Sequence, residues 1–172
     1  EIVKPGRIAV INFKGVDEQI QAWCAGKISK RIFDRAKEGG FPPVFIIVEE
    51  AHRFIPEGTK TVASSALATA ASEGRKFGVG LCIISQRIAK VSKDVLSQAG
   101  THIIHTLTSE ADLIAVAGSL EGWTKEMTEE VQRLPIGVVL ISADSLPQPI
   151  IVEIRPRESR HGGARRVLVP EG

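Results

Sequence analysis

The sequence contains only two cysteines, no apolar run of membrane-spanning length, and a net charge of just +2 over 172 residues. The missing apolar run predicts a protein that does not cross a membrane, and nothing at the start resembles a signal peptide. The small net charge does not by itself indicate a nucleic-acid partner. Cys24 and Cys82 fall within expected core elements, so we interpret them as small buried hydrophobic residues and not as a disulfide. Free cysteines of this kind are typical of a reducing cytoplasm. We therefore expect a cytoplasmic protein, and the absence of an initiator methionine indicates a piece of a longer chain.

The hydrophobic content of 43% is enough for one core in a chain of this length and predicts a single domain. We expect strands at 7–13, 44–49, 79–85, 101–105, 137–143 and 149–155, and helices at 18–37, 62–75, 94–99, 110–117 and 126–133. This alternation is typical of the α/β class, with a mostly parallel sheet flanked by helices. The strand at 101–105 is expected to be parallel, and the last two strands to form a β-hairpin. The domain should span 1–155, followed by a basic tail at 156–172.

Two adjacent carboxylates follow the most strongly apolar strand. The run from Val44 to Val48 is apolar without alternation, which is typical of a strand buried on both faces, and Glu49 and Glu50 come directly after it. The carboxyl ends of such strands are where α/β proteins bind ligands. A Mg-nucleotide site of the Walker B kind fits, with one acid on the metal's water shell and its neighbour positioning an attacking water. A buried strand that simply ends in solvated acids explains this motif alone equally well.

Two further polar residues flank the next strand, 79–85. Gln86 follows that strand, and its amide, which donates and accepts hydrogen bonds, can reach a γ-phosphate or an attacking water. Arg75 lies in the turn before the strand, where an arginine can stabilise the charge that develops during phosphoryl transfer. Each feature alone is weak evidence for a nucleotide site. Gln86, Arg75 and the two acids together form an ordered set of motifs, which is more specific.

This order of motifs resembles the HerA–FtsK superfamily of ring-shaped DNA-translocating ATPases, and the HerA type most closely. The resemblance rests on residues 44–56, with their Glu-Glu-Ala-His, and on 72–98, which contain Ser-Glu-Gly-Arg-Lys-Phe-Gly and Ile-Ile-Ser-Gln-Arg; it extends over roughly 5–155. It implies an incomplete RecA-like P-loop NTPase fold, with ATP and Mg²⁺ as cofactors. It also implies a helicase or translocase that acts on double-stranded DNA as a homo-hexameric ring. Archaeal and bacterial members of this type partner a nuclease in DNA-end processing for recombinational repair.

The same resemblance suggests a role for each site residue. Glu49 takes the position that binds Mg²⁺ through water, and Glu50 takes the catalytic position. Gln86 resembles the polar sensor of the γ-phosphate. Arg75 is the candidate arginine finger that reaches the nucleotide of a neighbouring subunit, with Lys76 beside it.

The chain departs from the family pattern in two ways. Glu49 stands where many triphosphatases have Asp, and no Gly-x-x-x-x-Gly-Lys-Ser/Thr occurs, so nothing in the chain cradles the β- and γ-phosphates. In this family that loop precedes the matched region. We therefore interpret the chain as the C-terminal part of the motor domain, which alone should not hydrolyse ATP. Because the P-loop strand lies between strands 79–85 and 101–105 in this superfamily, each of these should have one edge without its usual partner.

Several cations follow the expected strand ends and the connection that precedes the helix at 62–75. In a ring motor they could contact DNA phosphates, although solvated loop residues explain them as well. The candidates are Lys60, Arg87, Lys90 and Lys93. His52, next to the acids, is interpreted as an orienting residue or a satisfied polar neighbour and not as a metal ligand.

Two other functions compete with the translocase. Glu49-Glu50-Ala51-His52 suggests a DEAH-type helicase, but the Ser-Ala-Thr motif expected downstream is missing. The alternative from a different class is a non-catalytic interaction module, in which the acids and arginines hold an oligomer together. A P-loop upstream of Glu1 in the parent reading frame would favour the translocase.

Overall fold

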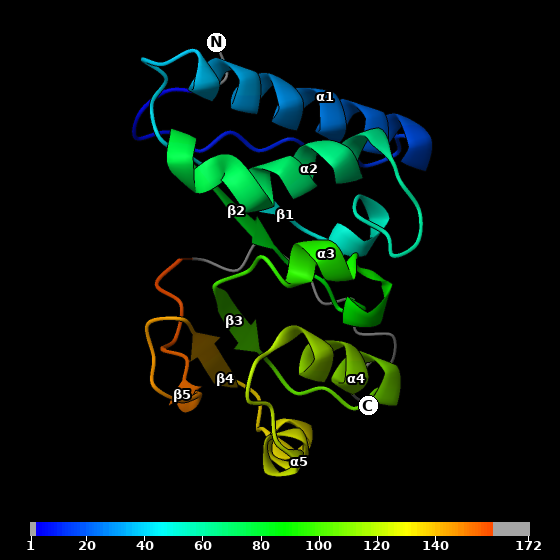
Figure 1. The fold of residues 1–172 in the computed structure, drawn as a ribbon, viewed down its shortest axis with the longest axis vertical. Helices are drawn as coiled ribbons and strands as arrows, with labels where there is room; N and C mark the ends of the chain where they lie inside the picture. The colour runs from blue at the N-terminus through cyan, green and yellow to red at the C-terminus, as the bar shows by residue number, and fades with distance from the viewer. Residues whose placement is uncertain (1–2, 160–172) are drawn as a thin grey trace, which may run out of the picture.

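The computed structural model describes residues 3–159, which form two halves stacked along the long axis of the molecule (Figure 1). The first half holds a parallel pair of strands, β1 (Val44–Val48) and β2 (Val79–Ile83). The second half holds an antiparallel sheet in the order β3-β4-β5, made of β3 (Thr101–Ile104), β4 (Val138–Ala143) and β5 (Ile150–Glu153). The expected α/β class and the C-terminal hairpin are confirmed.

Two helices cover one face of the parallel pair (Figure 1). α1 (Glu18–Lys37) has the predicted bounds, because the carboxylate of Asp17 accepts hydrogen bonds from two N–H groups of its first turn. α2 (Val62–Glu73) begins with a capping box between Thr61 and Ser64. The helices approach closely at Gly26, where an added Cβ would lie 2.6 Å from the backbone nitrogen of Ala63.

The parallel strands are covered on one face only. Val44, Ile46 and Val48 are half-buried, with Ile46 and Val48 packed against the cores under α1 and α2, while Phe45 and Ile47 are 67% and 59% exposed on the other face. The prediction that β1 is buried on both faces is therefore wrong for residues 3–159. An apolar run reflects the hydrophobicity of a strand and not the number of layers that cover it, and no helix among the described residues covers the second face.

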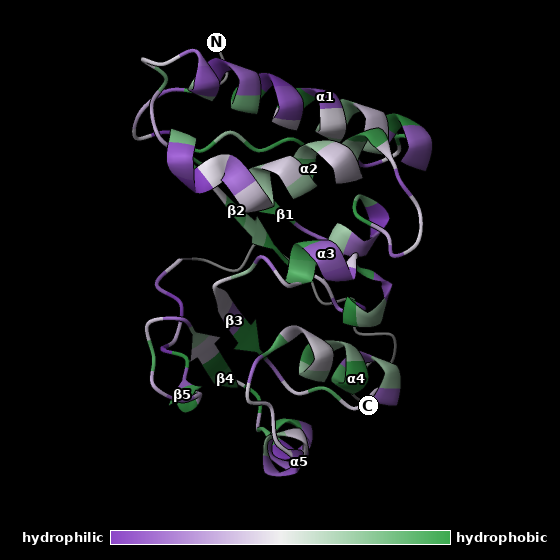
Figure 2. Cartoon of the chain, in the orientation of Figure 1, coloured by the Kyte–Doolittle hydropathy of each residue, from purple (hydrophilic) through white to green (hydrophobic). Residues whose placement is uncertain are grey.

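The second half has its own core. α4 (Glu110–Ser119) and α5 (Lys125–Arg133) pack with the antiparallel sheet, and Ser109 caps α4 as its sequence predicts. The buried members of this core are Ile104, Leu113, Val116, Val131, Leu134 and Leu140. Figure 2 shows apolar residues concentrated in the strands and in α4, whereas α1 and α5 are largely hydrophilic.

Short helices connect these elements. η1 (Ala51–Arg53) follows β1, η2 (Gly74–Phe77) follows α2, and η3 (Ile88–Lys90) and α3 (Lys93–Leu96) follow β2. Their positions matter for function, because η1 and η3 lie just after the carboxyl ends of the two parallel strands.

Two predictions about strands are wrong. Residues 7–13 form no strand, and Ile8 and Val10 are 93% and 85% exposed, since no strand in the described part of the chain pairs with this segment. β3 is not parallel to its neighbour but antiparallel to β4. Among residues 3–159, β2 and β3 are each the end strand of a sheet and do not pair with each other. That a P-loop strand belongs between them stays a prediction.

The expected basic tail lies largely outside the described residues. Of 156–172, the structure describes only 156–159, which form no helix or strand. The division of the chain at residue 155 stays a prediction.

Candidate active site

The acids and Gln86 meet in one small pocket at the carboxyl ends of β1 and β2. The pocket has a volume of about 230 Å³ and is lined by Glu49, Glu50, Ile84, Ser85 and Gln86. Pairing continues past both strands, since the N–H of Ile84 donates to the carbonyl of Val48 (2.9 Å) and the N–H of Ala51 donates to the carbonyl of Ile84 (2.9 Å). The two strands therefore end at the same level, as the sequence predicted from their shared direction.

Glu50 has an unusual backbone. Its φ of 51° and ψ of 46° lie in the left-handed region, and it is the one residue other than glycine with positive φ in the described part of the chain. This conformation ends β1 and starts η1 directly behind the acid pair. Strained residues of this kind gather at functional sites, which makes the position notable.

His52 connects the two strand ends. Its Nδ1 lies 3.1 Å from the hydroxyl oxygen of Ser85 and 3.4 Å from a carboxylate oxygen of Glu50. The hydroxyl oxygen of Ser85 also accepts a hydrogen bond from the N–H of Arg87 (3.1 Å). Nothing local in the sequence marks the role of Ser85, because its partner His52 lies 33 positions away in the chain.

The loops behind the pocket are bonded to each other. The N–H of Ser92 donates to the carbonyl of Ile55 and that of Glu57 to the carbonyl of Lys90, both at 2.9 Å, around a bridge between Pro56 and Val91. The carboxylate of Glu57 accepts from the N–H of Lys93 (2.9 Å).

A further bond connects the loop after β2 to the second half of the molecule. The buried carboxylate of Asp112, on α4, accepts a hydrogen bond from the N–H of Ala89 at 2.8 Å. The loop that carries Gln86 and Arg87 is thus held by both halves, which limits how far the end of β2 can move relative to the acids.

Arg75 and Lys76 lie at the opposite end of β2, in η2, and both are exposed. β2 has five residues, so it separates η2 from the pocket by roughly 17 Å at the usual rise per residue. The side chain of Arg75 is too short to bridge this distance. The structure therefore does not bring Arg75 or Lys76 together with Glu49, Glu50 and Gln86 within one chain.

The four candidate DNA-contact residues are all exposed. Arg87, Lys90 and Lys93 follow the carboxyl end of β2, and Lys60 immediately precedes Thr61, the N-cap of α2. α2 leads back toward the amino end of β2, so its own beginning lies near the carboxyl ends of the strands. The topology thus brings all four to the edge of the molecule that also carries the pocket.

The donor atoms of the pocket suit Mg²⁺. Two carboxylates, a hydroxyl and an amide offer oxygen ligands, which this hard cation prefers. No cluster of three or more His, Cys, Asp or Glu side chains that could enclose a metal occurs in residues 3–159.

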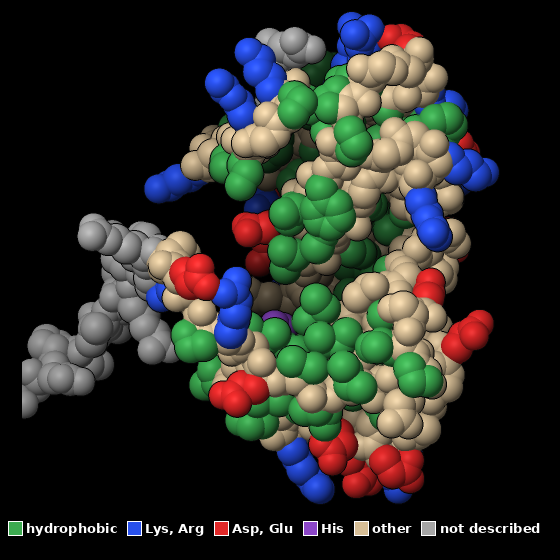
Figure 3. Space-filling model, turned by 90° about the vertical axis from the view of Figure 1, so that its left-hand side faces the viewer, with side chains coloured by type: hydrophobic (Ala, Val, Ile, Leu, Met, Phe, Trp, Pro, Cys, Tyr) green, Lys and Arg blue, Asp and Glu red, His purple; other side chains and the backbone are tan. Residues whose placement is uncertain are grey.

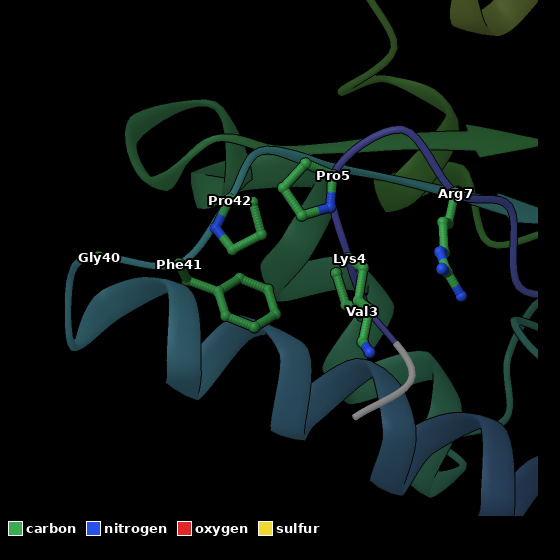
Figure 4. A pocket seen from close by; sticks show the side chains of 7 residues that line it. All are labelled: Val3, Lys4, Pro5, Arg7, Gly40, Phe41 and Pro42. Carbon is green, nitrogen blue, oxygen red and sulfur yellow. The ribbon is translucent and has the colours of Figure 1, made fainter.

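A larger hollow lies away from these groups. It has a volume of about 720 Å³ and is lined by Val3, Lys4, Pro5, Arg7, Gly40, Phe41 and Pro42 (Figure 4). It adjoins the segment leading into the amino end of β1, and no carboxylate or amide side chain lines it. The smaller pocket is the better candidate for an active site because two carboxylates, a hydroxyl and an amide line it. Figure 3 shows the surface hollowed between the two halves, with acidic and hydrophobic side chains around the hollow.

The fold is that of the P-loop NTPases. The genome packaging NTPase B204 of Sulfolobus turreted icosahedral virus 2, in complex with AMPPCP, superposes with a TM-score of 0.64 at 20% identity, over 79% of this chain and 63% of that one. VirB4 of Thermoanaerobacter pseudethanolicus superposes with a TM-score of 0.64 at 15% identity, over 85% of this chain and 40% of that one. No protein-family model matches the sequence.

Within that fold class, the resemblance to HerA is confirmed. A probable DNA double-strand break repair helicase HerA from Methanocaldococcus jannaschii is 39% identical over 129 residues, which is 75% of this chain and 26% of the relative. The DNA double-strand break repair helicase HerA of Pyrococcus furiosus is 29% identical over 88% of this chain and 33% of its own length. The chain spans about a third of the length of the curated relatives it matches. Among residues 3–159, no helix is both long and apolar enough to span a bilayer.

Proposed function

We propose that this chain is the C-terminal part of the motor domain of an ATP-driven DNA translocase of the HerA type, whose P-loop is supplied by a preceding segment of the same protein. The observation that carries the proposal is the meeting of Glu49, Glu50 and Gln86 in one pocket at the carboxyl ends of β1 and β2. If β1 simply ended in solvated acids, the two acids and an amide would have no reason to share a cavity. Nucleotide hydrolysis requires such groups to lie together.

Each group has a distinct task in this proposal. Glu50 positions the attacking water and accepts its proton, and Gln86 bonds the γ-phosphate or that water. Glu49 holds Mg²⁺ through a water molecule. The metal, when bound, supplies positive charge that offsets the negative charge of the triphosphate.

Arg75 is proposed to act in a ring, most simply a hexamer. Since β2 separates it from the pocket of its own chain, it could reach a nucleotide only from a neighbouring subunit. A head-to-tail interface of this kind closes into a ring when its rotation closes. Lys76, beside it, would add positive charge at the same interface.

DNA is the proposed substrate of the ring. Lys60, Arg87, Lys90 and Lys93 offer exposed cations at the edge next to the pocket, suited to phosphate contacts that read no sequence. Relatives of this chain are named as helicases of DNA double-strand break repair. We accordingly propose a role in DNA-end processing with a partner nuclease.

The test is Glu50→Gln in the full-length parent protein. Gln keeps the shape of the side chain but cannot accept a proton, so we expect steady-state ATP hydrolysis to fall by at least about a hundredfold while nucleotide still binds. ATP turnover and equilibrium nucleotide binding are measured on the same preparation. Glu129→Gln, an exposed glutamate on α5, is the matched control and should leave both unchanged. Undiminished hydrolysis in the Glu50 variant would remove Glu50 from the catalytic role.

A further inference from the structure

Among residues 3–159, the basic side chain that lies within 4 Å of the Glu50 carboxylate is His52. The carboxylate is 45% exposed, and the imidazole, at 18% exposure, is much more enclosed. A half-exposed glutamate has three side-chain torsions and would otherwise sample several directions at the mouth of the pocket. The histidine is therefore the group best placed to fix the direction of the Glu50 carboxylate.

The same ring nitrogen also faces the end of the other strand. Nδ1 lies 3.1 Å from the hydroxyl oxygen of Ser85 and 3.4 Å from the carboxylate oxygen of Glu50. A carboxylate oxygen only accepts, so a proton on Nδ1 suits both neighbours, while a lone pair there would oppose the carboxylate. We assign the proton to Nδ1 on these grounds.

This assignment decides what the Ser85 hydroxyl does. Its oxygen accepts from Nδ1 of His52 and from the N–H of Arg87, so both of its acceptor positions are used. Its own hydrogen is not needed by either neighbour. Since Ser85 lines the pocket together with Glu49, Glu50 and Gln86, the hydroxyl can donate to an oxygen bound there.

We propose that His52 is a positioning residue: it holds the Glu50 carboxylate and sets the Ser85 hydroxyl as a donor into the pocket. This inference rests on the proposed ATPase function and deepens it. His52 does not line the pocket, so its effect on hydrolysis passes through Glu50 and Ser85. Its position two residues after Glu50, in η1, keeps the spacing between acid and imidazole fixed by a single 3-10 turn.

Three substitutions in the full-length parent separate positioning from mere packing. The amide nitrogen of Asn lies near the place of Nδ1, that of Gln lies near the place of Nε2, and Leu offers no donor. We expect His52→Asn to keep most of the kcat for ATP hydrolysis. His52→Gln and His52→Leu should lower kcat by about 10- to 100-fold with nearly unchanged KM for ATP. The matched control His105→Gln, an exposed histidine in the second half, should leave kcat unchanged.

Thermal unfolding midpoints are measured for every variant. Equal kcat in the Asn, Gln and Leu variants would overturn the inference. An Asn variant as slow as the Leu variant would also overturn it, because a donor at the place of Nδ1 would then have no effect on kcat. Losses of kcat that only follow a fall in the unfolding midpoint would overturn it too, because they would reflect lost stability. If Glu50→Gln abolishes hydrolysis while His52→Leu does not, the proposed function stands and the role of His52 falls. A parent protein without ATPase activity overturns both.

Discussion

At the residue scale, the site combines groups that the sequence marks with one conformation that it does not. The acids and Gln86 could be predicted, because each directly follows an apolar run and parallel strands end at one edge. The left-handed backbone of Glu50 could not, since glutamate is not a residue that favours positive φ. Such a conformation costs roughly 1–2 kcal/mol for a residue with a Cβ, and neighbouring hydrogen bonds must hold it. The bond from Ala51 to the carbonyl of Ile84 is one that does.

The pKa of a second histidine yields a prediction about stability. Burial of the half-buried His102 imidazole on β3 lowers its pKa below the ordinary 6.5, although the carbonyl of Ala99 and the nearby Asp144 act in the opposite direction. The unfolded chain therefore binds this proton more readily than the folded one. Stability from this group is complete above pH 6.5 and is lost as the pH falls toward the lowered pKa of the folded state.

Denaturant unfolding of the protein on either side of that pH checks this prediction. The free energy of unfolding should decrease on acidification more steeply in the wild type than in His102→Gln, which does not titrate. An NMR titration of the imidazole gives the pKa directly. A pKa at or above 6.5 for His102, or equal slopes in the two proteins, would contradict the expected effect of burial.

At the scale of the elements, the close packing of α1 on α2 depends on Gly26. An added Cβ would lie 2.6 Å from the backbone of both Val62 and Ala63, and backbone cannot move aside as a flexible side chain can. We expect Gly26→Ala to lower the free energy of unfolding by about 1–3 kcal/mol, measured by denaturant titration. Gly118→Ala in α4 is the matched control, because nothing lies within 4 Å of its added Cβ. That change should be neutral or stabilising by up to about 1 kcal/mol, as alanine favours helix.

The opposite ranking of these two variants would show that the helices can separate at little cost.

Local signals predicted most elements, and nonlocal pairing explains the errors. The bounds of α1, the Ser109 cap and the hairpin of β4 and β5 follow from spacing and turn residues that lie close together in the chain. Residues 7–13 have the composition of a strand but no partner among residues 3–159, and strand formation needs one. The antiparallel direction of β3 depends on β4, about forty residues later, and no local pattern encodes it. The bond between His52 and Ser85 is nonlocal in the same way.

At the scale of the whole molecule, two halves with separate cores meet beside an unpaired edge. Within the described residues 3–159, β2 and β3 each lack a partner on one side, and Phe45 and Ile47 leave one face of the parallel pair exposed. Unpaired edges and bare apolar faces are costly in water. The pocket lies at the carboxyl end of β2, so a strand beside β2 that carries a phosphate-binding loop would extend the sheet and complete the nucleotide site together.

The backbone of β2 makes this testable one residue at a time. The N–H and carbonyl of Ile84 face β1, and successive residues of a strand direct these groups to alternate sides, so the N–H of Cys82 also faces β1. The N–H groups of Leu81 and Ile83 face the unpaired edge. We expect hydrogen exchange at Leu81 and Ile83 to be slow in the full-length parent and much faster in the 172-residue chain. Cys82 and Ile84 serve as internal controls, because their partner β1 is present in both proteins. Fast exchange at Leu81 and Ile83 in the parent would mean that the edge stays open there, and that the phosphate-binding segment, if the parent has one, joins the sheet elsewhere.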